Sequence, residues 1–426
     1  MIKQASLALI MRVTGTGFWL IYTIAMARLL PPADFGTLMY AINLALILAP
    51  VATLGFESST LKHAAPYWSE GQFAAFAGML RQSRRMACAG GMLCWAALVL
   101  GALWGVASPV TQDVSLAHLT GAAIFLAALM GIHRDSLRAA DRLIPAFLGL
   151  SILRTLLPLA GAGGLYSLDL LSVNTALWAF CAALCVAVGV EYIILSRLSL
   201  PAPRLTVSQW RSHRAVAVGT WAGDMAHVVL IRAPVLCLGI LTGPEVLALY
   251  VAVERIAQLG QFLTDAVRTA AAPTLARACQ NVQDRRAIAM GLSDISQLML
   301  KSGGMDAILL TLLAYPALWA MGDVYAQAYP LIFLFIAVQL GWTIPGPTAM
   351  AMNMMGLERR RTLWTILAAG LLIAGIFLWV DPHTAWAAIA LQCGVVWGLN
   401  LWQVWQIRRD RGVWSGVFAR WNERLL

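Results

Sequence analysis

Polar residues recur at helical spacing within an apolar stretch that covers 247–272. They are separated by four, four, three, four and three positions, and they are Tyr250, Glu254, Gln258, Gln261, Asp265 and Arg268. In an α-helix these steps place the side chains on one face, and Arg255 lies beside that face. The pattern predicts the wall of a polar cavity. The alternative is an internal ladder of ion pairs, in which Glu254 and Asp265 neutralise the arginines.

Other ionisable residues also lie inside apolar stretches. Asp224 and His227 are one helical turn apart, and Arg232 follows a little over two turns after Asp224. Because both residues of this pair can change charge near neutral pH when perturbed, they are candidates for proton transfer; a static pair that stabilises the fold is the alternative. Arg154 has no acid within a helical turn. In a membrane span, such a charge costs at least about 2.5–3.5 kcal/mol and should face a cavity or a partner.

A later apolar stretch is interrupted by Pro345, Gly346 and Pro347. Two prolines around a glycine break the helical hydrogen-bond ladder, so this segment is predicted to be either a hinge or a fixed kink filled by neighbours. A second group of charged residues lies near the expected ends of helices, where we expect contact with solvent. These residues are Glu57, Glu191, Arg268 and Asp306.

The composition identifies the elements that carry these residues. Of the 426 residues, 60% are hydrophobic and 12% are charged, against roughly 25% charged in soluble proteins. This excludes an ordinary cytosolic enzyme and a disordered chain and predicts an all-α polytopic membrane protein. Twelve stretches are long enough to span a bilayer: 7–30, 36–57, 86–107, 116–132, 143–165, 171–196, 215–241, 247–272, 297–321, 328–354, 362–380 and 385–407.

The positions of the basic residues predict the topology. With the N-terminus in the cytoplasm, 24 of the 30 Lys and Arg are assigned to cytoplasmic segments, including Lys301 at the inner end of its span; five lie within spans, and Arg28, at the outer end of the first span, is the only one assigned to the outer side. The positive-inside rule therefore places both termini in the cytoplasm. We predict two six-helix lobes, 1–196 and 215–407, joined by a cytoplasmic linker over 197–214. The basic tail 408–426 has apolar residues at helical spacing and is predicted to lie as a helix on anionic inner-leaflet lipids.

A short internal sequence repeat supports the division of the chain into two halves. The residues Leu30-Pro31-Pro32-Ala33-Asp34-Phe35-Gly36 follow the first span, and Leu241-Thr242-Gly243-Pro244-Glu245-Val246-Leu247 follow the seventh. Pro32 and Pro244 are 212 positions apart, which is almost half the chain. Two halves in the same orientation predict a pseudo-two-fold axis along the membrane normal, with a substrate site between the lobes.

At these residues the chain resembles a known family. Ala27-Arg28-Leu29-Leu30-Pro31-Pro32-Ala33-Asp34-Phe35-Gly36 is similar to the first turn of bacterial Wzx-type oligosaccharide flippases, although Pro31 stands where many relatives have glycine. Gly243-Pro244-Glu245 and the run from Ala272 to Arg277 resemble their second-half signature. These flippases belong to the multidrug/oligosaccharidyl-lipid/polysaccharide (MOP) exporter superfamily. The motifs cover about a quarter of the chain, whereas the span count and topology cover all of it.

The resemblance implies movement of a polyprenyl-pyrophosphate-linked oligosaccharide across the bacterial cytoplasmic membrane, by alternating access of two lobes, for cell-surface polysaccharide synthesis. Guanidinium groups stay charged when buried and bind phosphate oxygens in pairs. We therefore expect Arg154, Arg232 and Arg255 to bind the pyrophosphate, with Tyr250, Gln258 and Gln261 contacting glycan or water. Residues that could couple transport to ions are Asp224, His227, Glu254 and Asp265. Polysaccharide polymerase or ligase proteins are candidate partners.

Two other functions stay open: an ion-coupled small-molecule exporter of the drug-exporting MATE branch, and a non-transporting scaffold of a glycan-assembly complex. An enzyme is not expected, because no HExxH, Walker or GxSxG motif occurs and the predicted outer loops are short. No cofactor or metal is expected; the seven cysteines include no CxxC pair and nearly all lie in apolar stretches, which favours packing. No nucleic-acid partner is expected, because the basic residues are concentrated in the predicted cytoplasmic segments, as the positive-inside rule requires of a membrane protein.

Overall fold

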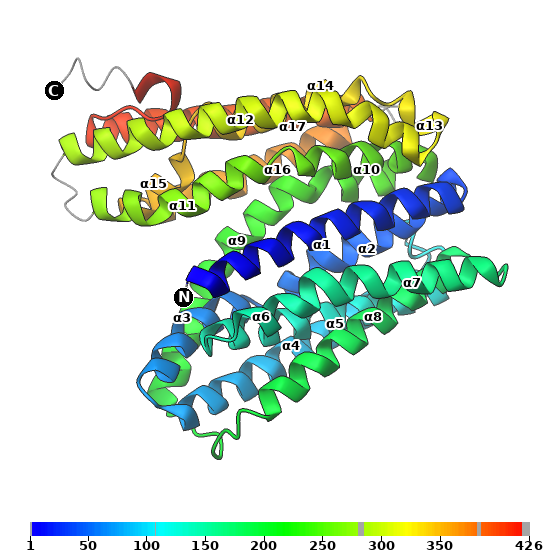
Figure 1. The fold of residues 1–426 in the computed structure, drawn as a ribbon, viewed down its shortest axis with the longest axis horizontal. Coiled ribbons are helices and arrows are strands. Elements are labelled where there is room, and N and C mark those ends of the chain that lie inside the picture. The colour runs from blue at the N-terminus through cyan, green and yellow to red at the C-terminus, as the bar shows by residue number, and fades with distance from the viewer. Residues whose placement is uncertain (1, 107, 280–284, 381–384, 420–426) are drawn as a thin grey trace. The chain divides into compact units, whose positions relative to one another are not determined.

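The computed structural model describes residues 2–106, 108–279, 285–380 and 385–419, and in these ranges it contains helices and no strand. The first unit begins with α1 (Ile2–Leu29) (Figure 1). The elements that follow are α2 (Pro32–Ala52), α3 (Phe56–Ser69), α4 (Phe73–Leu103), α5 (Val114–Ala139), α6 (Leu143–Phe147), the π-helix η1 (Leu148–Leu153), α7 (Arg154–Ser167), α8 (Val173–Ser196), α9 (Val207–Leu241), α10 (Pro244–Leu259), α11 (Phe262–Ala278), α12 (Arg285–Met321), α13 (Asp323–Ala326), α14 (Leu331–Thr343), α15 (Thr348–Met354), α16 (Glu358–Trp379) and α17 (Trp386–Arg411).

Each of the twelve predicted spans falls on one of these helices or on two or three consecutive ones. Ten helical segments of the described residues are long and apolar enough to cross a bilayer, and an eleventh is α10 taken together with α11. The first predicted span coincides with α1, whose 28 residues also exceed the length that a bilayer requires. The expected all-α fold with about twelve spans is confirmed.

The chain divides into two compact units, which are described separately. Unit 1 comprises Met1–Val228 and Gly243–Ala248; unit 2 comprises Val229–Thr242 and Leu249–Leu426. In unit 1, α5 packs against α2, α4 and α8. Its Ala- and Gly-rich face permits this, because small residues let helix backbones approach closely in a membrane protein: a Cβ on Gly121 would meet the ring of Trp95 on α4.

Polar residues at the outer ends of the spans fix where two of these helices begin. Asp113 accepts a hydrogen bond from the Ser115 backbone N–H at 2.8 Å and so caps α5. Ser172 and Thr175 form a reciprocal capping box at the start of α8. Such caps satisfy backbone N–H groups that the first helical turn leaves without partners.

The eighth predicted span in unit 2 is broken rather than continuous. The helix axis turns by 49° between Pro244–Leu259 and Leu263–Ala272. At the break, Asp306 of α12 accepts hydrogen bonds from the backbone N–H of Thr264 at 3.0 Å and of Leu263 at 3.3 Å. Gln339 of α14 donates to the Ala257 carbonyl on the other side. A break at membrane depth requires such partners, because lipid offers none.

This break corrects two predictions from the sequence. The polar stripe cannot occupy one continuous helical face, because the turn after Leu259 separates its last three members from Tyr250 and Glu254. Asp306 is not in solvent: its side chain also accepts from the Thr264 hydroxyl at 2.8 Å, and the residue is 3% exposed. A carboxylate facing exposed helical N–H groups is favoured by the helix dipole, which explains why this acid is buried.

The tenth span is interrupted at 344–347, and another segment of the chain fills the break. Ser415 donates to the Pro345 carbonyl at 3.0 Å, and the Val417 N–H donates to the Ile344 carbonyl at 3.1 Å. The Gly416 N–H donates to the Ser296 hydroxyl at 3.0 Å. We call residues 413–417 the strap. It supplies donors to two carbonyls that the interruption leaves without helical partners, so this state resembles the filled kink more closely than an open hinge; a hinge function of Pro345–Pro347 stays a prediction.

The strap also differs from the expected surface helix. The helix α17 ends at Arg411, Gly412 follows with a φ of 71°, and Val413 and Ser415 are buried in unit 2. Hydrogen bonds to the interrupted tenth span therefore hold this part of the tail. These bonds compete with the continuation of the tail as a helix on the lipid surface. Residues 420–426 of the predicted tail lie outside the described residues.

Gly416→Ala is expected to lower the midpoint of thermal unfolding. Gly416 has a φ of 72°, and an added Cβ would lie 2.6 Å from the Pro345 carbonyl carbon. Gly356→Ala is the matched control, because Gly356 has a φ of 76° in the same unit but open space around it. Both variants lose about 1–2 kcal/mol to the left-handed backbone, and overpacking adds roughly 1–3 kcal/mol at Gly416 alone. Equal losses, measured by thermal unfolding in detergent, would show that the strap does not pack tightly on the broken span.

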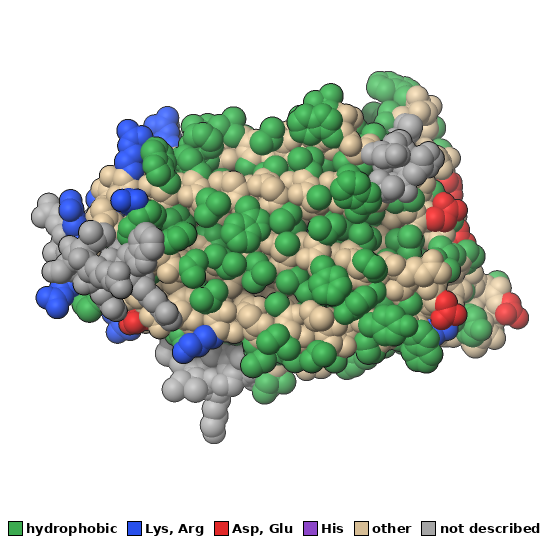
Figure 2. Space-filling model, turned by 90° about the horizontal axis from the view of Figure 1, so that it is seen from above, with side chains coloured by type: hydrophobic (Ala, Val, Ile, Leu, Met, Phe, Trp, Pro, Cys, Tyr) green, Lys and Arg blue, Asp and Glu red, His purple; other side chains and the backbone are tan. Residues whose placement is uncertain are grey.

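Basic and acidic side chains separate along the face that Figure 2 shows. Lys and Arg gather mainly toward one end of that face, Asp and Glu mainly toward the other, and hydrophobic side chains cover the region between them. This is the arrangement that the topology predicted from the sequence requires.

Candidate functional site

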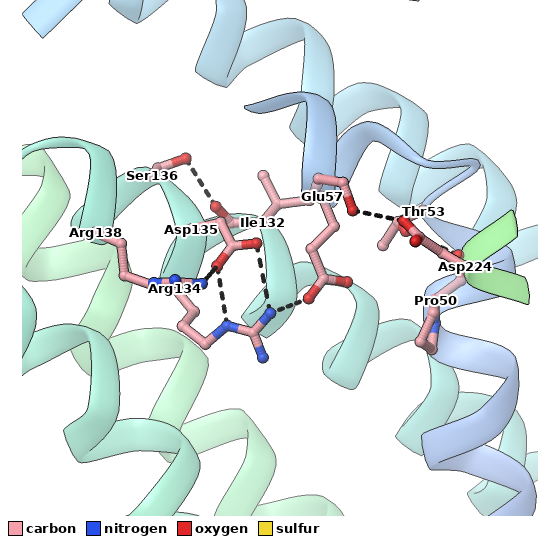
Figure 3. A network of polar contacts seen from close by, with 10 residues as sticks. Pro50, Thr53, Glu57, Ile132, Arg134, Asp135, Ser136, Arg138 and Asp224 are labelled. Atoms are coloured by element: carbon pink, nitrogen blue, oxygen red, sulfur yellow. Dashed lines mark hydrogen bonds and ion pairs between the residues drawn. The ribbon is translucent and has the colours of Figure 1, made fainter. Parts of the chain in front are cut away.

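Unit 1 contains a cluster of charged side chains where α3 begins and α5 ends (Figure 3). Arg134 contacts the carboxylate of Glu57 and donates to Asp135 Oδ1 at 3.1 Å. Arg138 donates to the same Asp135 oxygen at 2.9 Å. Asp135 is 5% exposed at its side chain, and Glu57 is 21% exposed, so Glu57 is largely buried and paired rather than solvated as predicted. Paired, hydrogen-bonded charges of this kind hold helix ends in fixed register.

Asp224 lies at the edge of this cluster. Its Oδ2 accepts a hydrogen bond from the Ser58 hydroxyl at 2.9 Å, which joins α9 to α3 (Figure 3). Asp224 is exposed and His227 is half-buried. The proposed proton-transfer role of these two residues stays a prediction.

A second group in unit 1 surrounds a buried carboxylate. Glu191 of α8 is 1% exposed, and neither of its carboxylate oxygens has a hydrogen-bond partner among the described residues. Its Oε2 lies 3.8 Å from His133 Nδ1. Arg84 donates to His133 Nε2 at 2.9 Å, so the ring hydrogen is assigned to Nδ1, which faces Glu191. The prediction that Glu191 is solvated is therefore wrong.

The backbone of η1 explains why this carboxylate has so little room. A Cβ on Gly149 would lie 3.1 Å from the Glu191 carboxyl carbon. A side chain at Gly149 would require the Glu191 carboxylate to shift from this position. Single π-turns of this kind often occur at functional sites, and here the π-turn lies directly before Arg154.

Arg154 is the first residue of α7, and it lies apart from the ion pairs. Its Nε is buried without a hydrogen-bond partner among the described residues, and it forms no ion pair with them. Its guanidinium carbon lies 5.8 Å from the centre of the Trp19 ring. Trp19 in turn stacks on Tyr22, with ring centres 5.2 Å apart. This guanidinium lies against aromatic rings and has no acid beside it. Its positive charge is therefore not neutralised and can attract an anion.

The arginines of unit 2 have other partners. Arg232 Nη1 donates to Glu254 Oε1 at 2.9 Å, and Glu254 is 6% exposed at its side chain. Tyr250 is fully buried one turn away, and its hydroxyl has no hydrogen-bond partner among the described residues. The sequence left open whether Glu254 neutralises an arginine or lines a cavity. For Arg232 the ion pair is present.

The remaining stripe residues lie in two environments. Arg255 is 6% exposed and donates to Gln258 Oε1 at 3.1 Å. Beyond the break, Gln261 is exposed, and Asp265 pairs with Arg268 at 3.4 Å with 60% of its side chain exposed. The structure therefore brings together the α10 members of the stripe and separates Gln261 and Asp265 from them. The roles given to these residues stay predictions.

The cluster of buried charges in unit 1 was missed by sequence reasoning. His133, Arg134 and Asp135 form a run of ionisable residues at the end of an apolar stretch, and Glu191 lies inside the predicted span 171–196. Both facts could have indicated a buried cluster. In the described part of the chain, no group of three or more His, Cys, Asp or Glu residues could hold a metal ion.

Comparisons with known proteins identify the fold. No protein-family model matches the chain, and no curated protein matches its sequence. A multidrug resistance MATE family transporter of the MOP superfamily, in an inward-facing conformation, matches with a TM-score of 0.72 at 12% identity, over 95% of this chain and 98% of that chain. The outward-facing conformation of such a transporter matches with a TM-score of 0.61 at 13% identity, over 95% of each chain.

A third solved structure is a MOP superfamily transporter from Pyrococcus furiosus, described as having a binding pocket of reverse polarity that suggests a different function. It matches with a TM-score of 0.59 at 12% identity, over 96% of this chain and 95% of that chain. The chain has the MATE/MOP transporter fold. At this identity the likeness extends to the fold alone.

Proposed function

We propose that this protein is a flippase that moves a polyprenyl-pyrophosphate-linked oligosaccharide across the bacterial cytoplasmic membrane. The transporter fold, which nearly the whole chain shares with MATE proteins, supports a membrane exporter. The resemblance of Ala27–Gly36 and of the run that follows Gly243 to Wzx-type proteins supports the substrate class. The conformations named for the solved relatives, inward-facing and outward-facing, support alternating access as the mode of transport.

The observation that carries the proposal is the state of Arg154. Arg154 is half-buried and its Nε is fully buried; a charge in a span without an acid is costly, and a fold retains such a group most readily when a ligand completes it. A pyrophosphate diester supplies two negative charges, and the guanidinium can bind phosphate oxygens through paired hydrogen bonds. A cationic drug would be repelled by this group. Arg232 and Arg255 are proposed to contribute after their present partners, Glu254 and Gln258, release them.

Reconstitution in liposomes tests this function. The full chain would be assayed for protein-dependent leaflet exchange of a pyrophosphate-linked oligosaccharide lipid, with a cationic dye as the competing substrate. We expect lipid exchange without dye movement. Dye efflux without lipid exchange would assign the chain to the drug-exporting branch, and no movement of either would favour a scaffold in a glycan-assembly complex.

A second candidate is an ion-coupled small-molecule exporter, and Glu191 is the observation that favours it. A buried carboxylate with no hydrogen-bond partner in the described structure can bind a proton or a cation. Ionisable residues at such depth in spans are functional-site hypotheses in general. We retain Asp224, His227, Glu254 and Asp265 as further proposed coupling residues, and polysaccharide polymerase or ligase proteins as proposed partners.

Glu191→Gln is expected to raise the midpoint of thermal unfolding by a few degrees while reducing ion-dependent transport. The amide removes the cost of burying an uncompensated charge but cannot take up a proton. Glu245→Gln, at an exposed position of unit 1, makes the same chemical change and should alter neither property. If Glu191→Gln lowered the unfolding midpoint and left transport intact, the carboxylate would be a structural group and the second candidate would lose its support.

A further inference from the structure

A groove lies between α16 and α17 of unit 2, at the ends that the topology places in the cytoplasm. Its volume is about 760 Å³, and its walls include Trp364, Trp402 and Trp405 together with Arg360 and Arg409. Neither the transport proposal nor the fold requires a groove at this place. Its residue types are those found at a membrane–water interface, with aromatic rings on one side and guanidinium groups on the other.

The aromatic wall has a fixed arrangement. The rings of Trp364 and Trp402 lie 4.5 Å apart between their centres, which joins the two helices. Trp364 and Trp405 nevertheless remain 41% and 49% exposed. Tryptophan is favoured at the boundary between headgroups and acyl chains, so these rings place the groove at that depth.

The basic wall carries more charge than its acid neutralises. Asp410 Oδ2 accepts from Arg360 at 2.7 Å and from Gln406 at 2.9 Å. This pair holds Arg360 at the rim while 58% of its side chain stays exposed. Arg409 lies over the Trp405 ring, 5.3 Å from its centre, and forms no ion pair with a described residue. Two arginines and one aspartate leave a single positive charge in the groove.

An apolar track leaves the groove along α16. Trp364, Leu367, Leu371 and Leu378 follow Arg360 at steps of four, three, four and seven, which keeps them on one helical face. The three leucines are 52%, 59% and 73% exposed. An acyl chain lying on this track would have its headgroup beside Arg360 and Arg409.

We propose that this groove binds the phosphate of an acidic phospholipid from the cytoplasmic leaflet, with one acyl chain lying along the exposed face of α16. A single positive charge matches a phosphodiester with one negative charge. Basic pockets between spanning helices on the cytoplasmic side are suited to such headgroups. A soluble anion would use the arginines but not the leucine track, and this difference separates a lipid from free phosphate.

The test uses the full chain in a neutral detergent and measures bound lipid by native mass spectrometry. Dioleoyl phosphatidylglycerol is compared with dioleoyl phosphatidylcholine, and we expect preferential retention of the acidic lipid. Arg409→Gln should reduce that preference about fivefold, the effect of one basic residue near a membrane surface. The matched control is Arg359→Gln, an exposed neighbour on α16 that is not among the groove-lining residues; it removes the same charge and should leave the preference unchanged.

Three results would overturn the proposal. The first is equal retention of the two lipids by the wild-type chain. The second is equal loss in Arg409→Gln and Arg359→Gln, which would indicate attraction by overall charge. The third is full displacement of the lipid by glycerol phosphate at the same concentration, which would indicate a site for a soluble anion. These outcomes do not depend on transport activity.

Discussion

Arg154→Ala is expected to lower oligosaccharide-lipid flipping at least about tenfold while leaving the protein folded. A hydrogen bond to a charged group contributes roughly 1.5–3 kcal/mol, and about 1.4 kcal/mol corresponds to a factor of ten. Because Arg154 forms no ion pair with a described residue, the alanine leaves no acid unpaired. The unfolding midpoint should therefore stay the same or rise. The measurements are leaflet exchange in liposomes and thermal unfolding in detergent.

Two further variants separate charge from shape at this position. Arg154→Lys keeps the charge but loses the planar fork that binds two phosphate oxygens, so it should recover only part of the activity. Arg197→Ala removes an exposed arginine at the end of α8 in the same unit and should flip lipid at the wild-type rate. Full activity in Arg154→Ala would remove the pyrophosphate assignment.

Asp306→Ala is expected to destabilise unit 2 by about 2–4 kcal/mol, the combined effect of a lost helix cap and lost hydrogen bonds to a charged acceptor. Asp306 satisfies the first N–H groups of α11 from a neighbouring helix. Without it, the N–H groups of Leu263 and Thr264 in the eighth span lose their charged acceptor. Denaturant unfolding in detergent, together with proteolysis near Gln261, would measure the loss.

The same helix supplies the control for this prediction. Asp294 also lies on α12 but is exposed, so Asp294→Ala should change stability by less than about 0.5 kcal/mol. Asp306→Asn retains an acceptor oxygen and should lose less than Asp306→Ala. Similar stability of Asp306→Ala and Asp294→Ala would mean that the break does not depend on its cap.

The sequence was sufficient to locate the spans and the interruption at Pro345–Pro347, but not the break within the eighth span. An apolar run of about 20 residues predicts a spanning helix from local information alone, so every predicted span fell on a helix. The break after Leu259 has only Gly260 as a local signal, and single glycines are tolerated inside helices. The break exists because Asp306 and Gln339, 42 or more positions away, supply its hydrogen bonds. Sequence spacing cannot reveal such partners.

The candidate site shows the same limit. The stripe period holds for Tyr250, Glu254 and Gln258, because they lie on one short helix. The position of Glu191 inside a predicted span could have indicated burial, but its neighbours His133 and Gly149 could not be inferred from spacing. Glu191 was expected in solvent because it lies near the end of a predicted span. A residue near a helix end can still face the protein interior, as Glu191 does.

The strap has a consequence for the biogenesis of the protein. Ser415 follows the carbonyl that it satisfies by 70 positions. At 5–20 residues per second this separation corresponds to roughly 4–14 s of synthesis. During that interval the tenth span has left the ribosome with its Ile344 and Pro345 carbonyls still lacking these donors, while the last two spans are being made. Insertion of unit 2 therefore cannot proceed strictly in order: one of its earlier spans must wait, beside the insertion machinery or a chaperone, for a later part of the chain.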